Sequence, residues 1–476
     1  MKKVLAVLLA AIFALSCLSG CREQPLLDPH DPVVLTLWHT YGEQADSPMN
    51  RLIDRFNSTV GMERGVVIRT TLITVAAKIS DRLAEAQDGT PGAVPLPDLF
   101  FCHNNDAAGF GVDRLLDWND YFTGAETAAF VPDFLADGMV DGRLAVLPVS
   151  KSTHVLYLSG GEFDRFSAAT GVTQESLNTW DGFFSAAEKY YTYSGGKPFC
   201  ALDYLLRAVE LYAVSAGADA SAFYRDGWYD FSDASLKAAY LRFAEAIAKG
   251  HIVVADQYSN TQVMTGETPA GMGSSAGILY YNDTVTYPDN TSEPMRLRVC
   301  PMPYVDSARR VDTQAGVGLC AVKSDERKAE AASVFAHWLT EGGRNLDFAA
   351  ETGYMPVTAD AYAGLDTYTF RDDGYRNLYT VLNTVKSGYA LLREPSYAGY
   401  YGRVNGLYAE IRKVQSAFPV RIRGGESAAA LAAELWELFR TAVFLCSCVQ
   451  TAQWTVCTWE TQLGGLPKGG NAAFLC

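Results

Sequence analysis

The chain has 476 residues, of which 49% are hydrophobic and 20% are charged, and its formal net charge at pH 7 is −15. This length suits two or more domains, and the hydrophobic fraction is ordinary for a globular protein. An acidic surface repels phosphate backbones and anionic lipid headgroups, so we expect no nucleic-acid partner.

The N-terminus is typical of an export signal. Lys2 and Lys3 precede an uncharged apolar run over residues 4–15, which is shorter than the roughly 20 residues that a membrane span needs. The run ends in LSGC, which resembles the lipobox of bacterial lipoproteins, so the resemblance implies a signal over 1–20 and a lipid on Cys21. An ordinary signal with a chance cysteine is the alternative. Residues 21–32 hold three prolines and are predicted to be a tether.

The first part of the body alternates strands and helices. Apolar residues at helical spacing follow Ser47 and Pro48, and Ile79 and Leu83 mark a second apolar helical face. The strands are predicted over 33–38, 66–75 and 98–102. Such alternation predicts a parallel sheet covered by helices, with ligands beyond the carboxyl ends of its strands. The segments in that position are 38–41 and 103–106.

The rest of the body is rich in helices. Thr179 is predicted to cap one helix, Ser232 and Asp233 precede a second, and Ser324, Asp325 and Glu326 open a third. Strands are predicted over 295–304 and 316–322.

The cysteines of the body, Cys102, Cys200, Cys300 and Cys320, are isolated, and no CxxC occurs, which excludes zinc-ribbon spacing. Isolated cysteines are mostly buried, although an exported location would permit a Cys300–Cys320 disulfide. The segment 446–476 differs in composition from the body and is predicted to be a non-homologous or disordered extension. A disulfide-stapled cap or a metal site is the alternative, and it would use Cys446, Cys448, Cys457 and Cys476.

Several stretches, taken in order over about residues 33–440, resemble the extracellular solute-binding proteins of ABC importers, especially the carbohydrate group. The glycerol-3-phosphate binders are the most similar subgroup. The matching stretches are LTLWHTYG (35–42), PDLFF (97–101), LLDWNDYF (115–122), GRLAVLPVSKSTHVLYLSGGEF (142–163), TWDGFFSAAEKY (179–190), AGMGSSAGILY (270–280) and ETGYMPVTADAY (351–362).

The resemblance implies an α/β fold of two lobes, each a central sheet flanked by helices, with the ligand cleft between them (the type II periplasmic-binding-protein fold). Lobe one is expected over 33–149 and 310–358, and lobe two over 150–309 and 359–445. The implied function is that of a monomeric lipoprotein without cofactor or metal. It would sit on the outer face of the cytoplasmic membrane, bind a sugar or a polyol phosphate, and deliver it to a permease.

A sugar-binding cleft needs aromatic rings for the apolar face of the sugar and paired donors and acceptors for its hydroxyls. The resemblance to the glycerol-3-phosphate binders implies contacts at or near Ser152, Ser275, Gly316, Tyr354 and Arg403. The full candidate set is Trp38, Tyr41, Asn104, Ser152, Thr153, Ser274, Ser275, Gly316, Tyr354 and Arg403.

Several of these residues have an alternative interpretation. Trp38 is equally compatible with a core position, and His39 and His103 with satisfied polar positions. The chain has TVAAKIS (74–80) where the glycerol-3-phosphate binders carry a tyrosine, and His103-Asn104-Asn105 where they carry an acid. Arg403 could therefore clamp a phosphate or bond a neutral sugar.

Two other functional classes remain. GSSAG (273–277) has the G-x-S-x-G form of a nucleophile elbow, so an esterase would use Ser275, and His337 is the histidine that follows it. No buried strand is predicted before Ser275, which argues against the esterase. The other class is a binding lipoprotein that acts as a sensor or adhesin without a transporter.

Overall fold

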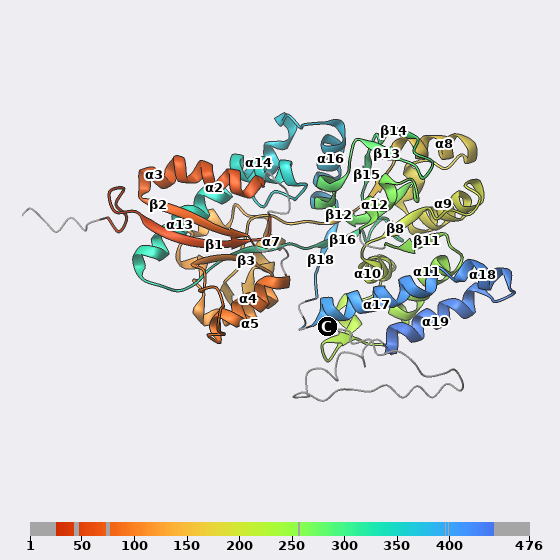
Figure 1. Ribbon diagram of the computed structural model, residues 1–476, viewed down its shortest axis with the longest axis horizontal. Coiled ribbons are helices and arrows are strands. Elements are labelled where there is room, and N and C mark those ends of the chain that lie inside the picture. Colours follow the sequence, from red (N-terminus) through yellow and green to blue (C-terminus); the bar gives the residue numbers. More distant parts are fainter. Residues whose placement is uncertain are drawn as a thin grey trace, which may run out of the picture.

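The computed structural model describes residues 25–41, 47–72, 77–255, 258–395, 397 and 399–441, which form two α/β lobes joined by extended segments (Figure 1). This confirms the predicted two-lobed fold. The predicted signal over 1–20, the lipidated Cys21 and the segment 446–476 lie outside the described residues.

Lobe one is built on a five-stranded sheet in the order β2-β1-β3-β17-β6. The strands β2, β1 and β3 are parallel, whereas β17 runs antiparallel to β3 and β6. The strands are β1 (Val33–His39), β2 (Val66–Leu72), β3 (Leu99–Cys102), β6 (Leu147–Pro148) and β17 (Gly318–Ala321). The helices of this part are α2 (Pro48–Ser58), α3 (Val60–Arg64), α4 (Ala77–Gln87), α5 (Asn104–Phe110), α6 (Gly124–Thr127), α7 (Pro132–Asp137), α13 (Glu326–Thr340), α14 (Gly342–Thr352) and α15 (Ala359–Ala363), with the hairpin β4 (Met139–Val140) and β5 (Arg143–Leu144).

Lobe two has a second five-stranded sheet, in the order β11-β8-β12-β7-β15, in which β7 is antiparallel to both neighbours. Its strands are β7 (His154–Leu158), β8 (Cys200–Leu202), β11 (Ile252–Val254), β12 (Ala270–Ser274) and β15 (Arg298–Cys300). Its helices are α8 (Gly160–Thr170), α9 (Trp180–Tyr193), α10 (Leu205–Ser215), α11 (Ala234–Ala248), α12 (Ser259–Met264), α16 (Asp373–Gly388), α17 (Tyr400–Gln415), α18 (Phe418–Arg423) and α19 (Ala428–Thr441). The short strand pairs are β9 (Tyr224–Arg225) with β10 (Trp228–Tyr229), and β13 (Thr284–Thr286) with β14 (Ser292–Pro294).

Three extended segments lie together where the lobes meet, and we call them the hinge: residues 149–153, 314–317 and 353–357. Lys151 pairs with Met355, and Ser152 exchanges backbone hydrogen bonds of 2.9 Å with Ala315. Beside the hinge, β16 (Val311–Gln314) pairs with β18 (Ala390–Arg393). The chain thus crosses between the lobes more than once.

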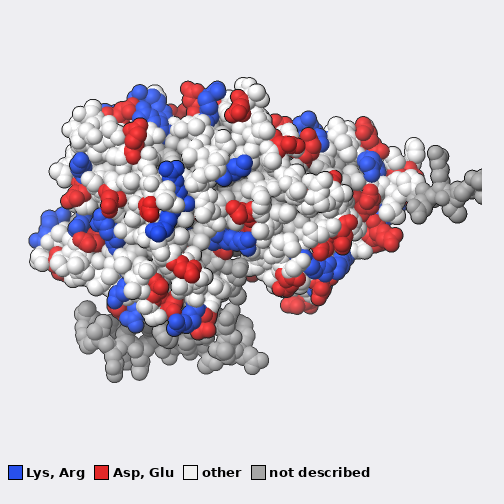
Figure 2. Space-filling model, turned by 180° about the vertical axis from the view of Figure 1, so that it is seen from behind, with Lys and Arg blue, Asp and Glu red and all other residues white. Residues whose placement is uncertain are grey.

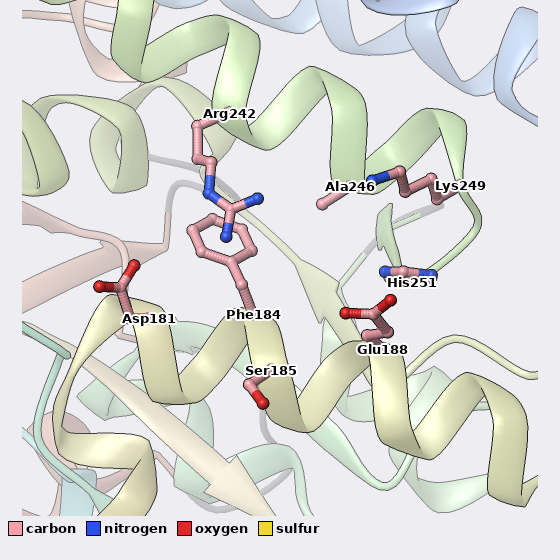
Figure 3. Close-up of a pocket in the computed structure, with 8 residues that line it drawn as sticks. All are labelled: Asp181, Phe184, Ser185, Glu188, Arg242, Ala246, Lys249 and His251. Atoms are coloured by element: carbon pink, nitrogen blue, oxygen red, sulfur yellow. The ribbon is translucent and has the colours of Figure 1, made fainter. Parts of the chain in front are cut away.

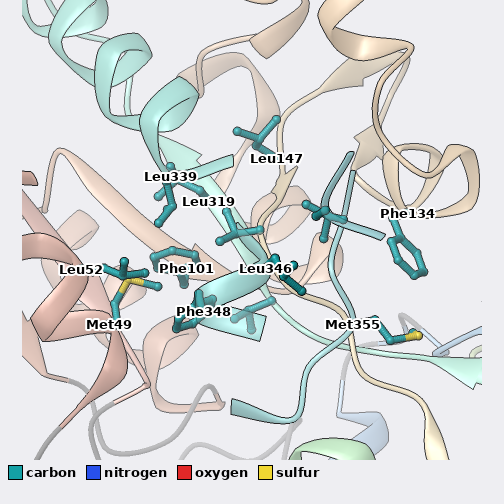
Figure 4. Packing of buried hydrophobic residues seen from close by; sticks show 14 of the residues in the cluster. Met49, Leu52, Phe101, Phe134, Leu147, Leu319, Leu339, Leu346, Phe348 and Met355 are labelled. Atoms are coloured by element: carbon teal, nitrogen blue, oxygen red, sulfur yellow. The ribbon is translucent and has the colours of Figure 1, made fainter. Parts of the chain in front are cut away.

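One hydrophobic core runs from lobe one through the hinge. It packs the apolar face of α2 against α13, α14 and the sheet (Figure 4). The same cluster continues through Met355 to Val155 and Tyr157 of lobe two, whereas a second cluster fills the other face of the lobe-two sheet. The two lobes therefore share packed core where the hinge joins them.

Most predicted helix starts are confirmed. Thr179 Oγ1 accepts a hydrogen bond of 3.1 Å from Gly182 N at the start of α9, and Asp233 and Asp325 cap α11 and α13 in the same way. The predicted strand over 295–304 is shorter than expected, at Arg298–Cys300.

Two sequence-based expectations are wrong. Residues 25–32 are not a free tether, because Leu27 is buried in the core of lobe one and Arg327 pairs with Asp31 at 2.8 Å. A Cys300–Cys320 disulfide is not formed, because Cys300 lies in β15 of lobe two and Cys320 in β17 of lobe one.

Acidic and basic side chains are interspersed over the face shown in Figure 2. Among the residues that the structure describes, no helix combines the length and the apolar character needed to cross a membrane.

Candidate functional site

A pocket of about 410 Å³ lies in lobe two, beside the hinge, and we call it the tyrosine pocket. Its volume falls within the roughly 300–1,000 Å³ of typical small-molecule sites. The walls come from the segments after β8 and β12, from α12, and from the hinge. The lining residues are Tyr157, Asp203, Tyr204, Tyr258, Ser259, Asn260, Thr261, Ser274, Ala276, Gly277, Tyr280, Tyr281 and Tyr354.

The topology explains why these residues meet. The parallel strands β8 and β12 end at the same edge of the sheet, so Asp203 and Ser274 lie side by side at their carboxyl ends. Ser274 caps the 3₁₀ turn Ser275–Tyr280, and its Oγ accepts a hydrogen bond of 3.3 Å from Ala276 N. Tyr157 donates to the carbonyls of Ser274 and Ser275, at 3.0 and 2.7 Å, which fixes this turn over β7.

Asp203 is the acidic group of the tyrosine pocket. Its Oδ1 accepts a hydrogen bond of 2.6 Å from Ser259 N. Removal from water raises the pKa of Asp203 to about 7, although the bonds from Ser259 act in the opposite direction. Gly273 makes room for the carboxylate, since a Cβ atom there would lie 2.0 Å from Asp203 Oδ2.

Aromatic surface is available at the mouth of the pocket. Tyr258 is 62% exposed and Tyr280 is 47% exposed, whereas most other tyrosines of lobe two are buried. At the hinge side, Tyr354 lines the pocket and its ring meets the ring of Tyr41 edge to face at 5.9 Å. Tyr41 in turn bonds Ser150 Oγ at 3.0 Å. Tyr354 thus connects the aromatic packing of lobe one with the tyrosine pocket.

The two lobes also touch across the cleft. His103, at the end of β3, has its Nδ1 3.8 Å from a carboxylate oxygen of Glu394, which follows β18. Tyr401 of α17 donates to Glu394 at 2.7 Å, and its ring centroid lies 6.0 Å from that of His103. Arg207 donates to the carbonyls of Leu392 and Arg393, at 3.0 Å each, and so fixes the strand that carries Glu394.

The structure brings several predicted residues to the hinge and the tyrosine pocket. Ser274 and Tyr354 line the pocket. Ser152, Thr153 and Gly316 form the hinge beneath it, and Gly316 has a φ of 118°, a conformation that favours glycine. Asn104 begins α5 beside His103 and is half-buried.

Two predicted residues lie elsewhere. Trp38 is 2% exposed and packs with Phe100 in the core of lobe one, because helices cover both faces of that sheet. Arg403 lies on α17 with its guanidinium 5.4 Å from the ring centroid of Trp228, in a different hollow of lobe two. Neither lines the tyrosine pocket.

Ser275 is fully buried and serves the hinge. Its N–H donates to Thr153 O at 2.8 Å, and its Oγ accepts from Thr153 N at 3.4 Å. His337 instead stacks on Phe122 of lobe one, with ring centroids 3.9 Å apart, and bonds Ser333. The expectation that no buried strand precedes Ser275 is wrong, because the buried strand β12 ends directly before it. The two residues that an esterase would use are nevertheless not brought together, because Ser275 lies at the hinge and His337 packs on Phe122 in lobe one.

Another hollow lies between α9 and α11 on the outer side of lobe two (Figure 3). It holds about 220 Å³, less than a typical ligand site. Its charged side chains have structural roles, since Arg242 covers the ring of Phe184 and Lys249 pairs with Glu245 at 2.7 Å. We do not count it as the site.

Four residues near the site were not predicted from the sequence: Asp203, Tyr204, Tyr258 and Glu394. A signal existed for the first two, because polar residues directly after an apolar run are the pattern that singled out residues 103–106. The run Cys200–Leu202 has only three residues, too few to show a period. Tyr258 and Glu394 follow no motif, and only the fold brings them to the cleft.

Comparisons with known proteins agree with this architecture. The family model described as bacterial extracellular solute-binding protein matches residues 52–373, more than half of the chain. No curated protein sequence matches the chain.

Solved structures show the same fold at low sequence identity. The cyclic alpha-maltosyl-1,6-maltose binding protein of Arthrobacter globiformis is 17% identical, with a TM-score of 0.62 over 87% of this chain and 99% of that chain. UgpB of Mycobacterium tuberculosis, in complex with glycerophosphocholine, has the same identity, TM-score and coverage. The sugar-binding protein MalE of Xanthomonas citri is 16% identical, with a TM-score of 0.61 over 88% of this chain and all of that one. By its family match and its two-lobed fold, the chain belongs to the bacterial extracellular solute-binding proteins.

Proposed function

We propose that the protein is an exported lipoprotein that captures a carbohydrate in the tyrosine pocket and delivers it to the permease of an ABC importer. The observation that carries the proposal is the make-up of this pocket, in which exposed tyrosine rings surround hydrogen-bonding groups beside a hinge. Tyrosine faces cover the CH-bearing face of a sugar ring, while Asp203, Asn260 and Ser274 offer partners for its hydroxyls. Three similar structures carry sugar or glycerophosphocholine ligands in their names.

Binding would favour the closed arrangement of the lobes. A ligand shifts such an equilibrium only through its higher affinity for the closed form. Contacts of one ligand with Tyr258 of lobe two and with Tyr354 of the hinge would supply that difference. The closed form would then dock on the permease, and ATP would be used there.

A polyol phosphate is the second candidate ligand. A phosphate needs cationic partners, and Arg403 lies in another hollow. Among the described residues that line the tyrosine pocket, there is no lysine, arginine or histidine. This charge distribution favours a carbohydrate over a phosphate ester.

A thermal-shift panel of sugars and sugar phosphates tests the ligand class. A true ligand at about 100 times its Kd adds roughly 2.7 kcal/mol to the free energy of unfolding. We expect carbohydrates to stabilise the protein and glycerol 3-phosphate to leave it unchanged. Stabilisation by glycerol 3-phosphate but not by carbohydrates would mean that the ligand is a polyol phosphate. The absence of permease genes beside the gene of this protein would favour a sensor role over transport.

Tyr258→Ala and Tyr280→Ala should each weaken sugar binding, because each removes an exposed ring from the pocket. The loss of one stacked ring should lower affinity about tenfold, the ratio that corresponds to 1.4 kcal/mol. Tyr193→Ala is the matched control, since Tyr193 is 40% exposed on α9, away from the pocket. Equal losses in all three variants would argue against this pocket.

The lipid anchor at Cys21 is tested separately. Cys21→Ser should abolish the incorporation of labelled fatty acid and release the protein from the membrane fraction. Continued membrane association of the variant, without labelling of the wild type, would favour an ordinary signal.

A further inference from the structure

The neighbouring backbone leaves space for the carboxylate of Asp203 and donates a hydrogen bond to it. It follows β8 directly, and Gly273 on the neighbouring strand leaves the space that it fills, because any Cβ there would overlap Oδ2. Ser259 N holds Oδ1 at 2.6 Å. The acidic group is thus fixed in the wall of the tyrosine pocket.

The groups that face Asp203 do not neutralise it. Tyr157, Tyr204, Tyr281 and Cys200 all have their pKa raised, mainly by burial and further by the charge of Asp203, so they are neutral at pH 7. Tyr258 and Glu394 add to the same effect at Tyr204. The described lining of the pocket supplies no cationic side chain. The carboxylate is therefore an acidic group whose counter-charge is not provided by the residues around it.

The tyrosine rings around this carboxylate favour the same kind of ligand group. Tyr204, Tyr258, Tyr280 and Tyr354 line the pocket together with Asp203. The face of an aromatic ring carries negative potential and attracts cations such as ammonium groups. A carboxylate among such rings forms a binding place for a cation that also has an apolar surface.

We propose that the tyrosine pocket is a cation subsite, in which Asp203 and the surrounding rings hold an ammonium group on a hydroxyl-rich ligand, and that the protein prefers an amine-bearing saccharide. This inference rests on the proposed function and narrows its substrate class. Asp203 is then the specificity-determining residue. It pairs with the ammonium group and disfavours phosphate and carboxylate ligands.

Proton release follows from this assignment. An ammonium group beside Asp203 favours the charged carboxylate and lowers the pKa of about 7 that burial gives it. Binding at pH 7 should therefore expel part of a proton per ligand. A neutral saccharide that only donates hydroxyl hydrogen bonds should expel less.

Three matched disaccharides test the charge requirement by isothermal titration at pH 7. They consist of glucosamine, of N-acetylglucosamine, and of N,N,N-trimethylglucosamine, so that the first two differ in charge and the third carries a charge without N–H donors. We expect both cationic sugars to bind at least about tenfold more tightly than the N-acetyl sugar, the ratio that corresponds to 1.4 kcal/mol. Titration in two buffers of different ionisation enthalpy should show proton release with the cationic sugars.

Asp203→Asn tests the residue itself, because asparagine keeps the shape and an acceptor but removes the charge. In this variant the preference for the cationic sugars over the N-acetyl sugar should vanish, because the ammonium group loses its carboxylate partner. Asp289→Asn is the control, since Asp289 caps an exposed turn of lobe two. If Asp203→Asn fails to fold, the affinities of the wild type for the three disaccharides, and its proton release, still test the cation subsite.

The outcomes separate the two proposals. If a neutral oligosaccharide binds and the cationic sugars bind no more tightly, the cation subsite is overturned and the carbohydrate function stands. Tighter binding of the cationic sugars that persists in Asp203→Asn also overturns the cation subsite. If no saccharide of any charge binds, the proposed function itself fails, and the cation subsite fails with it.

Discussion

Asp312 is fully buried in β16, and burial raises the pKa of its carboxyl to about 8. Its Oδ1 accepts hydrogen bonds from Thr313 N at 2.7 Å and His154 N at 3.3 Å. The folded pKa exceeds the ordinary value of 3.8, so the native state holds this proton more tightly than the unfolded state. The free energy of unfolding therefore falls as the pH rises from 3.8 towards about 8. His154, whose pKa burial lowers to about 3, is neutral over this range.

Asp312→Asn should remove this decline, because asparagine stays neutral and keeps the acceptor for Thr313 and His154. Above the folded pKa the variant should be more stable than the wild type by at least about 1 kcal/mol, since one pKa unit corresponds to 1.36 kcal/mol. Urea unfolding at acidic and at alkaline pH measures the difference. Identical pH slopes in variant and wild type would contradict the account of Asp312.

Gly273→Ala tests the space beside Asp203. The added Cβ would lie 2.0 Å from Oδ2, so the carboxylate must move from the position in which it accepts the hydrogen bond of Ser259 N. We expect ligand affinity to fall at least about tenfold and stability to fall by about 1–3 kcal/mol, as for other overpacked sites. Gly406→Ala in α17 is the control, because a Cβ there meets nothing within 4 Å. Unchanged ligand affinity in Gly273→Ala would remove Asp203 from the site.

At the scale of elements, α14 holds the hinge through one side chain. Asn345 is fully buried, donates to Val149 O at 2.7 Å and accepts from Val357 N at 2.8 Å. These partners belong to two of the three hinge segments. Asn345 therefore holds these two hinge segments at a fixed spacing whether or not a ligand is bound.

Asn345→Ala should therefore lower the free energy of unfolding by about 2–6 kcal/mol, because two buried backbone groups lose partners at about 1–3 kcal/mol each. Urea denaturation measures the change. Asp347→Ala, on the same helix with its side chain 47% exposed, should stay within about 0.5 kcal/mol of the wild type. A loss in Asn345→Ala no larger than in this control would show that the hinge is held by other contacts.

Local sequence signals predict some elements of this fold and not others. Helices with a capping residue and an apolar face, such as α9, α11 and α13, could be placed from local signals alone. The candidate residues of the hinge were also found, by resemblance. Asp203 follows a strand of only three residues, and Arg403 was expected at the ligand although it packs on Trp228. Those placements depend on contacts between distant segments, which no local pattern contains.

At the scale of the whole molecule, His103 of lobe one and Glu394 of lobe two form a contact across the cleft, 3.8 Å apart. Both side chains are about three-quarters buried. When His103 is protonated, a partly exposed ion pair of this kind contributes about 0.2–1 kcal/mol. If the pair belongs to the closed form, its loss should lower ligand affinity through the lobe equilibrium.

His103→Ala should weaken ligand binding by a factor of about 1.4 to 5, the range that corresponds to 0.2–1 kcal/mol. Isothermal titration with the most stabilising sugar of the panel measures it. Glu410→Gln on the exposed side of α17 is the control. An affinity that rises in His103→Ala would mean that this contact opposes ligand entry.

A crystal structure with that most stabilising sugar tests the central claim most directly. The account predicts the sugar between the lobes, against Tyr258 and Tyr280 and within hydrogen-bonding distance of Asp203. A sugar bound instead in the hollow beside Arg403 and Trp228 would contradict it.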